Sequence, residues 1–185
     1  NAISNADLLL FGSLVCRNEG NLTTLLQLIE KAQKTVFDVN LRPPFYSQSL
    51  IEQLLHKANI VKMNDDELEK IISWYEVKKS LKAQMIFVME KFAIETLIMT
   101  EGKHGAYCMH DKLLYSQKSF TVKVQDTVGS GDSFLAAFLY KMLAKADWQE
   151  CLEFACATGA LVATKSGGTP AINEALVIEF IQKQL

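Results

Sequence analysis

Several features that would assign this 185-residue chain to a membrane, a metal centre or an oxidising compartment are absent from its sequence. No run reaches the roughly 20 consecutive apolar residues that span a bilayer, and no signal peptide with a basic beginning opens the chain. The cysteines form no C-x-x-C pair and no Cys/His cluster with the spacing of metal ligands. They are Cys16, Cys108, Cys151 and Cys156. We therefore expect reduced thiols and a cytoplasmic protein.

An excess of positive charge is also missing. Nineteen basic and 21 acidic side chains give a formal net charge of −2, so no long-range field attracts nucleic acid or an anionic membrane. We expect neither as a partner, and any anion must be bound by local groups. The hydrophobic content of 49% is enough for a substantial core. Without a repeat, a low-complexity tract or a linker, the chain is predicted to form a single domain over residues 1–185.

Segments typical of buried strands alternate with segments in which apolar residues have helical spacing. The predicted strands lie at 7–13, 35–40, 59–64, 94–100, 105–110 and 112–117. The predicted helices lie at 25–32, 48–58, 65–75 continuing through 79–93, 131–146, 148–165 and 173–184. A turn is expected at Asp111 and Lys112, between the last two strands. This alternation predicts an α/β fold with a mainly parallel sheet and helices on both of its faces.

Polar residues and glycines follow the predicted strands. Ligands of such sheets bind beyond the carboxyl ends of the strands, and parallel strands bring these ends to one edge. The candidate residues are Asn40, Arg42, Asn64, Glu67, Thr100, Gly102, Gly105 and the segment 126–132. The sequence therefore predicts that groups distant along the chain share one rim.

The segment DTVGSGD, residues 126–132, places glycines and two acids before an apolar helix. The glycines let the backbone approach a ligand, and a helix that begins near Gly131 directs free N–H groups outward to form an anion site. Amides of residues 128–131 would bind a phosphate there, and Asp132 would orient and deprotonate an attacking hydroxyl. The alternative is that Asp132 only caps the helix or adds charge to its first turn.

The other groups also have structural alternatives. Asn64 and Glu67 stand three residues apart at a predicted helix start, where they could form a capping box or provide oxygens to a hydrated Mg²⁺. Arg42 could pair with a phosphate or lie in solvent. The glycines of TEGKHGAY could form an ordinary turn or make room for a nucleotide. The residues alone leave these alternatives open.

In combination, these motifs resemble the signatures of the ribokinase/PfkB family of carbohydrate kinases. DTVGSGDSF is similar to the family's D-T-x-G-A-G-D, with Ser130 in the alanine position. VKMNDDEL resembles its N-x-x-E magnesium motif, and TEGKHGAY its T-x-G-x-x-G nucleotide motif. FDVNLRPPFY resembles the D-x-N-x-R stretch of fructokinase-like members, and ACATGALVATKSGGTP the closing helix and loop beside the adenine. The resemblance implies a ribokinase-like three-layer α/β/α fold.

The resemblance also implies roles for individual residues, with ATP and a small sugar as substrates. The implied catalytic residues are Asp132 as the base and Gly129, Ser130 and Gly131 as the anion hole. The implied nucleotide-binding residues are Asn40, Asn64, Thr100, Gly102, Gly105 and Thr127. Arg42 would lie near the sugar or a phosphate. Fructose is the first candidate for the sugar, and 2-keto-3-deoxygluconate, ribose and nucleosides stay open.

Two cation sites are implied as well. Asn64 and Glu67 would serve Mg²⁺ through bound water. The loop 165–171, with Asp126 and Val128, corresponds to the monovalent-cation (K⁺) site of some members, where Ala171 takes a position that sometimes carries a hydroxyl. The resemblance therefore leaves open whether the K⁺ site is functional.

The resemblance covers roughly the last two thirds of a family chain. The family's first strands, its glycine-pair motif, an acid for the sugar hydroxyls and a small β-sheet lid have no counterpart in the sequence. We therefore expect this chain by itself to bind ATP weakly and to phosphorylate a sugar poorly or not at all. A free sheet edge also invites pairing with a second copy, so a homodimer stays open.

Two other functions compete with that of a sugar kinase. A nucleotide-binding module that has lost turnover would carry the same motifs. A dinucleotide-dependent oxidoreductase is disfavoured, because GSGDSF is one residue short of G-x-G-x-x-G and is followed by helices rather than a strand. ATP binding and sugar-dependent ADP release, measured separately, would distinguish the three.

Overall fold

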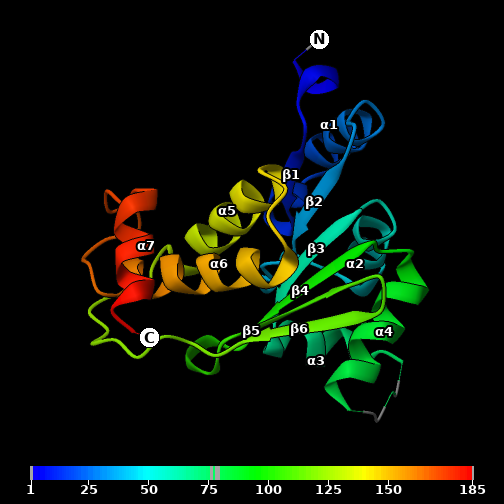
Figure 1. Cartoon of the computed structure of the whole chain (residues 1–185). Coiled ribbons are helices and arrows are strands. Elements are labelled where there is room, and N and C mark those ends of the chain that lie inside the picture. The colour runs from blue at the N-terminus through cyan, green and yellow to red at the C-terminus, as the bar shows by residue number, and fades with distance from the viewer. Residues whose placement is uncertain (1, 76, 78–79, 185) are drawn as a thin grey trace. The chain divides into compact units, whose positions relative to one another are not determined.

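A computed structural model describes residues 2–75, 77 and 80–184 (Figure 1). The chain divides into two compact units. Unit 1 comprises Asn1–Thr100 and Met109–Leu114, and unit 2 comprises Glu101–Cys108 and Tyr115–Leu185. The strands form a six-stranded sheet with the order β1-β2-β3-β4-β5-β6, so neighbours in the sheet are also neighbours in the chain. The α/β class predicted from the sequence is confirmed.

The first four strands pair in parallel. Their bounds are β1 Leu9–Gly12, β2 Thr35–Asp38, β3 Ile60–Asn64 and β4 Thr96–Thr100. All of β2 and the first four residues of β3 and of β4 are buried, as the continuous apolar runs predict. At the carboxyl ends, Asn64 lies directly opposite Thr100. The register therefore brings two of the predicted site residues together.

Helices connect these strands within unit 1. Their bounds are α1 Glu19–Ile29, α2 Gln48–Leu55, α3 Asp65–Ser73 and α4 Leu81–Phe92, with 3₁₀ helices η1 Ile3–Asn5 and η2 Ser13–Cys16. Asn18, Ser47 and Asn64 begin α1, α2 and α3, because each side chain accepts a bond from the backbone N–H three residues later. The cap at Asn18 explains why α1 begins well before Leu25, the first residue of its apolar pattern.

The predicted continuation of the third helix into the fourth is wrong, since α3 and α4 are separate helices. α3 ends at Ser73, where the N–H of Trp74 turns back only three residues to the carbonyl of Ile71. α4 begins at Leu81 and stops at Ala93, whose backbone is left-handed with φ of 58°. Apolar residues recur at helical spacing on both sides of the break, so the pattern alone did not reveal it.

A hairpin follows β4. Its strands are β5 Ala106–His110 and β6 Leu113–Gln117. Asp111 and Lys112 between them have positive φ values of 49° and 64°, as in the type I′ turn that joins antiparallel strands through two residues. The turn predicted from the sequence is confirmed, and the sheet is mainly parallel with a hairpin at one edge.

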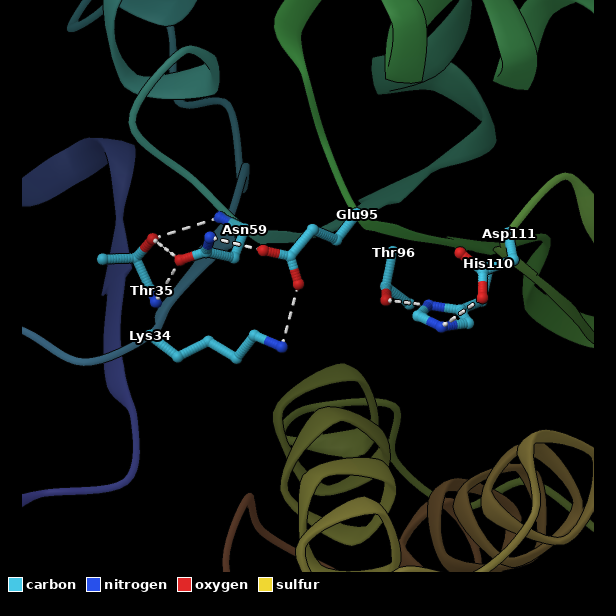
Figure 2. Close-up of polar contacts among 7 residues, drawn as sticks. All are labelled: Lys34, Thr35, Asn59, Glu95, Thr96, His110 and Asp111. Carbon is cyan, nitrogen blue, oxygen red and sulfur yellow. Dashed lines mark hydrogen bonds and ion pairs between the residues drawn. The ribbon is translucent and has the colours of Figure 1, made fainter.

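Polar side chains join the amino ends of β2, β3 and β4. Figure 2 shows them, and they are Lys34, Thr35, Asn59, Glu95, Thr96, His110 and Asp111. The side-chain oxygen of Asn59 accepts bonds from the backbone N–H and the hydroxyl of Thr35 (2.9 Å each), and its amide donates to Glu95 (2.8 Å). The hydrogen-bonded ion pair with Lys34 (2.9 Å) lowers the pKa of Glu95. The network holds the starts of three strands in register, at the opposite ends of β3 and β4 from Asn64 and Thr100.

Unit 2 contains mainly helices. They are α5 Ser130–Leu143, α6 Trp148–Ala163, α7 Glu174–Gln182 and the 3₁₀ helix η3 Gly102–His104. The three α-helices agree with the predicted ranges to within a few residues. Figure 1 shows α5 and α6 side by side, and a Cβ at Gly159 of α6 would lie only 3.2 Å from the carbonyl oxygen of Ser130. In the described part of the chain, no helix is long and apolar enough to cross a bilayer.

Candidate active site

The carboxylate of Asp126 fixes the loop before α5. Its Oδ1 accepts a hydrogen bond from the Val128 N–H (3.0 Å), and its Oδ2 accepts one from the Gly167 N–H (3.2 Å). These bonds, that of Val128 first, lower the pKa of Asp126. Asp126 therefore joins the segment 126–129 to the loop that contains Gly167, which is the loop predicted to bind K⁺.

Gly129 occupies a position that tolerates no side chain. It is the N-cap residue of α5, and its φ of 77° is in the left-handed region, which glycine adopts without steric cost. A Cβ at this position would lie 2.0 Å from the carbonyl oxygen of Gly168. The glycine is therefore required by close contact between two loops of unit 2.

The first turn of α5 presents open backbone donors. Val128 N–H is bonded to the Asp126 carboxylate, and Ser130 N–H donates to the carbonyl of Thr127 (3.2 Å), so two of the amides predicted to bind a phosphate are engaged. The N–H groups of Gly131 and Asp132 lie in the first helical turn, where no intrahelical acceptor is available. The amides of Val128 and Ser130 are therefore removed from the predicted set 128–131, and an anion site at the start of α5 stays a prediction.

Asp132 is exposed in the first turn of α5. Among the described residues no side chain caps this helix, so the alternative in which Asp132 serves as the cap is wrong. A purely electrostatic role in the first turn stays open, because the positive helix end stabilises an ionised carboxylate. An exposed carboxylate beside open amides can also accept a proton from a bound alcohol.

The hydroxyl of Ser130 has a different environment. Its Oγ is buried and has no hydrogen-bond partner in the described structure, although buried hydroxyls are normally paired. Ser130 therefore contributes to the turn through its backbone, and nothing in the structure explains a hydroxyl where the motif usually has alanine.

Gly129→Ala is expected to lower the free energy of unfolding by about 2–4 kcal/mol. The new methyl group would overlap the Gly168 carbonyl and would strain a left-handed residue. Urea denaturation measures the change. Gly167→Ala is the matched control: its φ is 83° and nothing lies within 4 Å of its Cβ, so only the left-handed strain of about 1–2 kcal/mol applies. Equal losses in the two variants would contradict the contact.

The two glycines of TEGKHGAY differ in their surroundings. Gly105 has φ of 117°, and a Cβ there would lie 2.0 Å from the carbonyl oxygen of Gln117. Its own carbonyl accepts a bond from the Glu101 N–H (2.8 Å), so a tight turn accounts for this glycine. Gly102 has φ of 50° and nothing within 4 Å of its Cβ, which leaves room for a ligand beside it. The nucleotide contacts of both glycines stay a prediction.

Asn64 and Glu67 form the capping box that begins α3. The Asn64 side chain accepts the Glu67 N–H, and Glu67 Oε2 accepts the Asn64 N–H (2.8 Å each). Glu67 Oε1 accepts a third bond from the N–H of Leu41 (2.8 Å). The structural alternative for this motif is therefore present, and both oxygens of a buried carboxylate are engaged.

The segment after β2 carries Asn40 and Arg42. Asn40 has a left-handed backbone with φ of 40°, which asparagine tolerates better than most residues. Arg42 is exposed and directly precedes the cis peptide bond between Pro43 and Pro44. Its guanidinium is accessible to an anion, and the alternative of a solvated arginine is equally compatible with this exposure.

The sequence reasoning missed a buried ion pair between β2 and β3, close to this segment. Lys62 Nζ in β3 lies 3.1 Å from Asp38 Oδ1 in β2, and the two side chains are 10% and 12% exposed. They are register partners of adjacent parallel strands. A single charged residue within each apolar strand was the available signal, but the pairing becomes evident only when the register is known.

The predicted site residues therefore fall into two sets. In unit 1 the structure gathers the ends of β2, β3 and β4 through register and hydrogen bonds; the predicted residues there are Asn40, Arg42, Asn64, Glu67 and Thr100. In unit 2 they are Gly102, Gly105, Asp126, Thr127, Gly129, Ser130, Gly131 and Asp132. The single rim expected for all of them stays a prediction.

Comparison with known proteins decides the family. A family model for the pfkB family carbohydrate kinases matches residues 1–175. The chain belongs to this family. Among PfkB relatives, it is 28% identical over 142 residues to 2-dehydro-3-deoxygalactonokinase of Haloferax volcanii, and 29% identical over 157 residues to fructokinase-2 of Solanum lycopersicum. These matches cover 75% and 77% of this chain, and 44% and 47% of the relatives.

A solved structure has a similar fold. A crystal structure of fructokinase from Vibrio cholerae O395, with fructose, ADP and calcium ion bound, matches with a TM-score of 0.82 at 24% identity. The match covers 94% of this chain and 60% of that chain. The resemblance seen in the motifs is therefore confirmed, and this chain spans less than half the length of the two relatives.

Proposed function

We propose that this chain carries the nucleotide-binding and catalytic part of a kinase that transfers a phosphoryl group from ATP to a hydroxyl of a small sugar. The start of α5 supports this most directly, because an exposed Asp132 lies there beside amides without helical acceptors. Membership of the PfkB family supports the class of reaction. Fructose is the first candidate for the acceptor.

Two kinds of group share the chemical step. The N–H groups of Gly131 and Asp132, with the positive end of α5, bind the terminal phosphoryl group and stabilise the charge that develops on it. Gly129 and Ser130 form the turn that presents these amides, and Thr127 precedes it beside the transferred group. The carboxylate of Asp132 accepts the proton of the sugar hydroxyl while the sugar oxygen bonds to phosphorus and the bond to ADP breaks.

Unit 1 contributes polar groups toward the nucleotide phosphates. Asn64 and Thr100 are opposite each other at the ends of β3 and β4, so one ligand group can contact both side chains. Asn40 lies at the end of the neighbouring strand β2. Arg42, which is exposed, pairs with a phosphate or with the sugar. In unit 2, Gly102 and Gly105 border the nucleotide.

Mg²⁺ fits these residues through water. Within the described ranges, no three His, Cys, Asp or Glu side chains come together as a metal centre. Asn64 and Glu67 already accept backbone hydrogen bonds, but each carboxylate oxygen keeps a second lone pair that can accept a bond from a water molecule. Glu67 would thus hold a water molecule of the hydrated Mg²⁺. The bound ion would offset negative charge on the phosphates.

A K⁺ ion is proposed at the loop 165–171. Asp126 joins this loop to the segment before α5 and supplies negative charge beside it. Backbone carbonyl oxygens of the loop are ligands of the kind that a hard cation prefers. Ala171 adds no hydroxyl to the set.

The second candidate function is a nucleotide-binding module without turnover. The exposed Asp132 in the first turn of α5 is compatible with it, because a purely electrostatic role beside the amides also explains this position. Turnover requires that the sugar be positioned and water excluded, whereas nucleotide binding does not. The two candidates therefore differ in whether addition of a sugar causes bound ATP to be converted to ADP.

Titration calorimetry with ATP and Mg²⁺, together with an assay of ADP release, separates the candidates. The acceptors to compare are fructose, 2-keto-3-deoxygluconate, ribose and a nucleoside, because one relative is named for fructose and another for a 2-dehydro-3-deoxy sugar acid. We expect ATP binding by this chain, and ADP release that depends on the sugar and is largest with fructose in a longer polypeptide that contains this chain. Binding without release in the longer polypeptide would support the module, and no ATP binding would refute both functions.

A further inference from the structure

We propose that Ser13 and Glu67 are positioning residues that together clamp the peptide group between Asn40 and Leu41. The clamp fixes how Asn40 and the following Arg42 are presented at the carboxyl end of β2. Its consequence for ligand binding rests on the proposed function, whereas the clamp itself is a property of unit 1 alone.

The two hydrogen bonds meet on a single peptide group. The Ser13 hydroxyl donates to the carbonyl oxygen of Asn40 (3.1 Å), and the N–H of Leu41 donates to Glu67 Oε1 (2.8 Å). The Asn40 carbonyl and the Leu41 N–H belong to the same planar unit, so the peptide is held from both sides. Because the two bonds point in opposite directions, a flip of this peptide would break both of them.

The side chains that make the clamp are buried. Ser13 is 1% exposed and Glu67 is 7% exposed. A buried hydroxyl and above all a buried carboxylate cost free energy unless they are hydrogen-bonded. A movement of the peptide would therefore leave buried polar atoms of Ser13 and Glu67 without these bonds, and this cost stabilises the observed conformation.

The clamped conformation is one that the backbone does not favour by itself. Asn40 has φ of 40°, which is left-handed, and this region is sparsely populated by residues other than glycine. Two hydrogen bonds to the next peptide select this conformation over the alternatives. The direction of the Asn40 side chain follows from it.

Glu67 also links this segment to the start of α3. Its second oxygen accepts the N–H of Asn64 (2.8 Å), so one carboxylate holds the backbone next to two residues proposed to face the nucleotide, Asn40 and Asn64. The distance between the ends of β2 and β3 is therefore fixed before any ligand binds. A helix cap alone would use only the bonds between Glu67 and Asn64.

Amide exchange tests the clamp in the ligand-free chain. Glu67→Gln keeps the size of the side chain but leaves one acceptor oxygen for two N–H groups, so exchange in the segment 39–45 should rise about tenfold. Asp66→Asn is the matched control, because Asp66 is exposed in the same helical turn and its replacement removes the same charge. No rise with Glu67→Gln, or an equal rise with Asp66→Asn, would overturn the proposal.

Ser13→Ala provides an independent variant should Glu67→Gln fail to fold. It removes only the bond to the Asn40 carbonyl and should also raise exchange in the segment 39–45. Because both side chains act on one peptide, the effects of the two substitutions should not add in the double variant. Additive effects would show that the two bonds act separately and would refute a clamp.

A readout of ADP affinity separates positioning from general stability. Glu67→Gln should weaken ADP binding about tenfold in the otherwise unchanged chain, and should have a clearly smaller effect when Asn40 is already alanine. An equal loss in both backgrounds would mean that Glu67 does not act through Asn40. If the unchanged chain binds no ADP, the proposed function fails, and the exchange result still decides the clamp.

Discussion

Asp132→Asn is expected to lower the rate of sugar phosphorylation by about 10²–10⁴-fold, while the affinity for ATP stays within a few-fold. Asparagine cannot take the proton of the sugar hydroxyl, but it keeps the shape of the side chain and the backbone N–H of residue 132. The open amides at the start of α5 therefore remain available to the phosphate. ADP release at saturating ATP and sugar measures the rate, in a longer polypeptide that contains this chain.

Asp65→Asn is the matched control for this experiment. It removes an exposed acid from the first turn of α3, so it changes the net charge equally without touching α5. Its rate should equal that of the unchanged protein. A rate within a few-fold of normal for Asp132→Asn would show that the base lies elsewhere, and a loss of ATP binding would assign Asp132 to the nucleotide instead.

Lys62→Met is expected to lower the free energy of unfolding by about 3–5 kcal/mol. The substitution removes the ammonium group that lies 3.1 Å from the buried carboxylate of Asp38, and a methionine side chain offers this carboxylate neither a charge nor a hydrogen bond in its place. Urea denaturation followed by circular dichroism measures the difference.

Two further variants show whether burial is the cause. Lys112→Met breaks an ion pair with Glu90 in which the side chains are 76% and 60% exposed, and it should cost less than about 1 kcal/mol. Combining Lys62→Met with Asp38→Leu should recover most of the loss, because both members of the ion pair are then apolar. Similar losses for Lys62→Met and Lys112→Met would contradict this account of the pair.

Much of the fold could be predicted because burial leaves a local record in the sequence. Continuous apolar runs marked β2, β3 and β4, and the pair Asp111 and Lys112 marked the turn of the hairpin. The break between α3 and α4 could not be found in this way, since both helices have an apolar face. The end of α4 at Ala93 depends on a left-handed backbone, and an alanine in the sequence does not predict this conformation.

The candidate site was predictable to a smaller extent. The glycine at 129 could be assigned to a tight backbone turn before a helix start, whereas the catalytic role of Asp132 stays a prediction. The sequence could not predict which N–H groups lack an acceptor, because those of Val128 and Ser130 donate within their own loop. Ser13 and Lys62 were missed for a related reason: their partners, Asn40 and Asp38, are chosen by the tertiary structure and not by spacing along the chain.

The position of Asp126 has a consequence for selectivity among anions. Its carboxylate accepts the N–H groups of Val128 and Gly167. An anionic ligand could bind these two N–H groups only by displacing the Asp126 carboxylate. In the proposed function, a terminal phosphate accepts bonds from the amides of Gly131 and Asp132 instead, so the proposal favours the end of a polyphosphate over its middle.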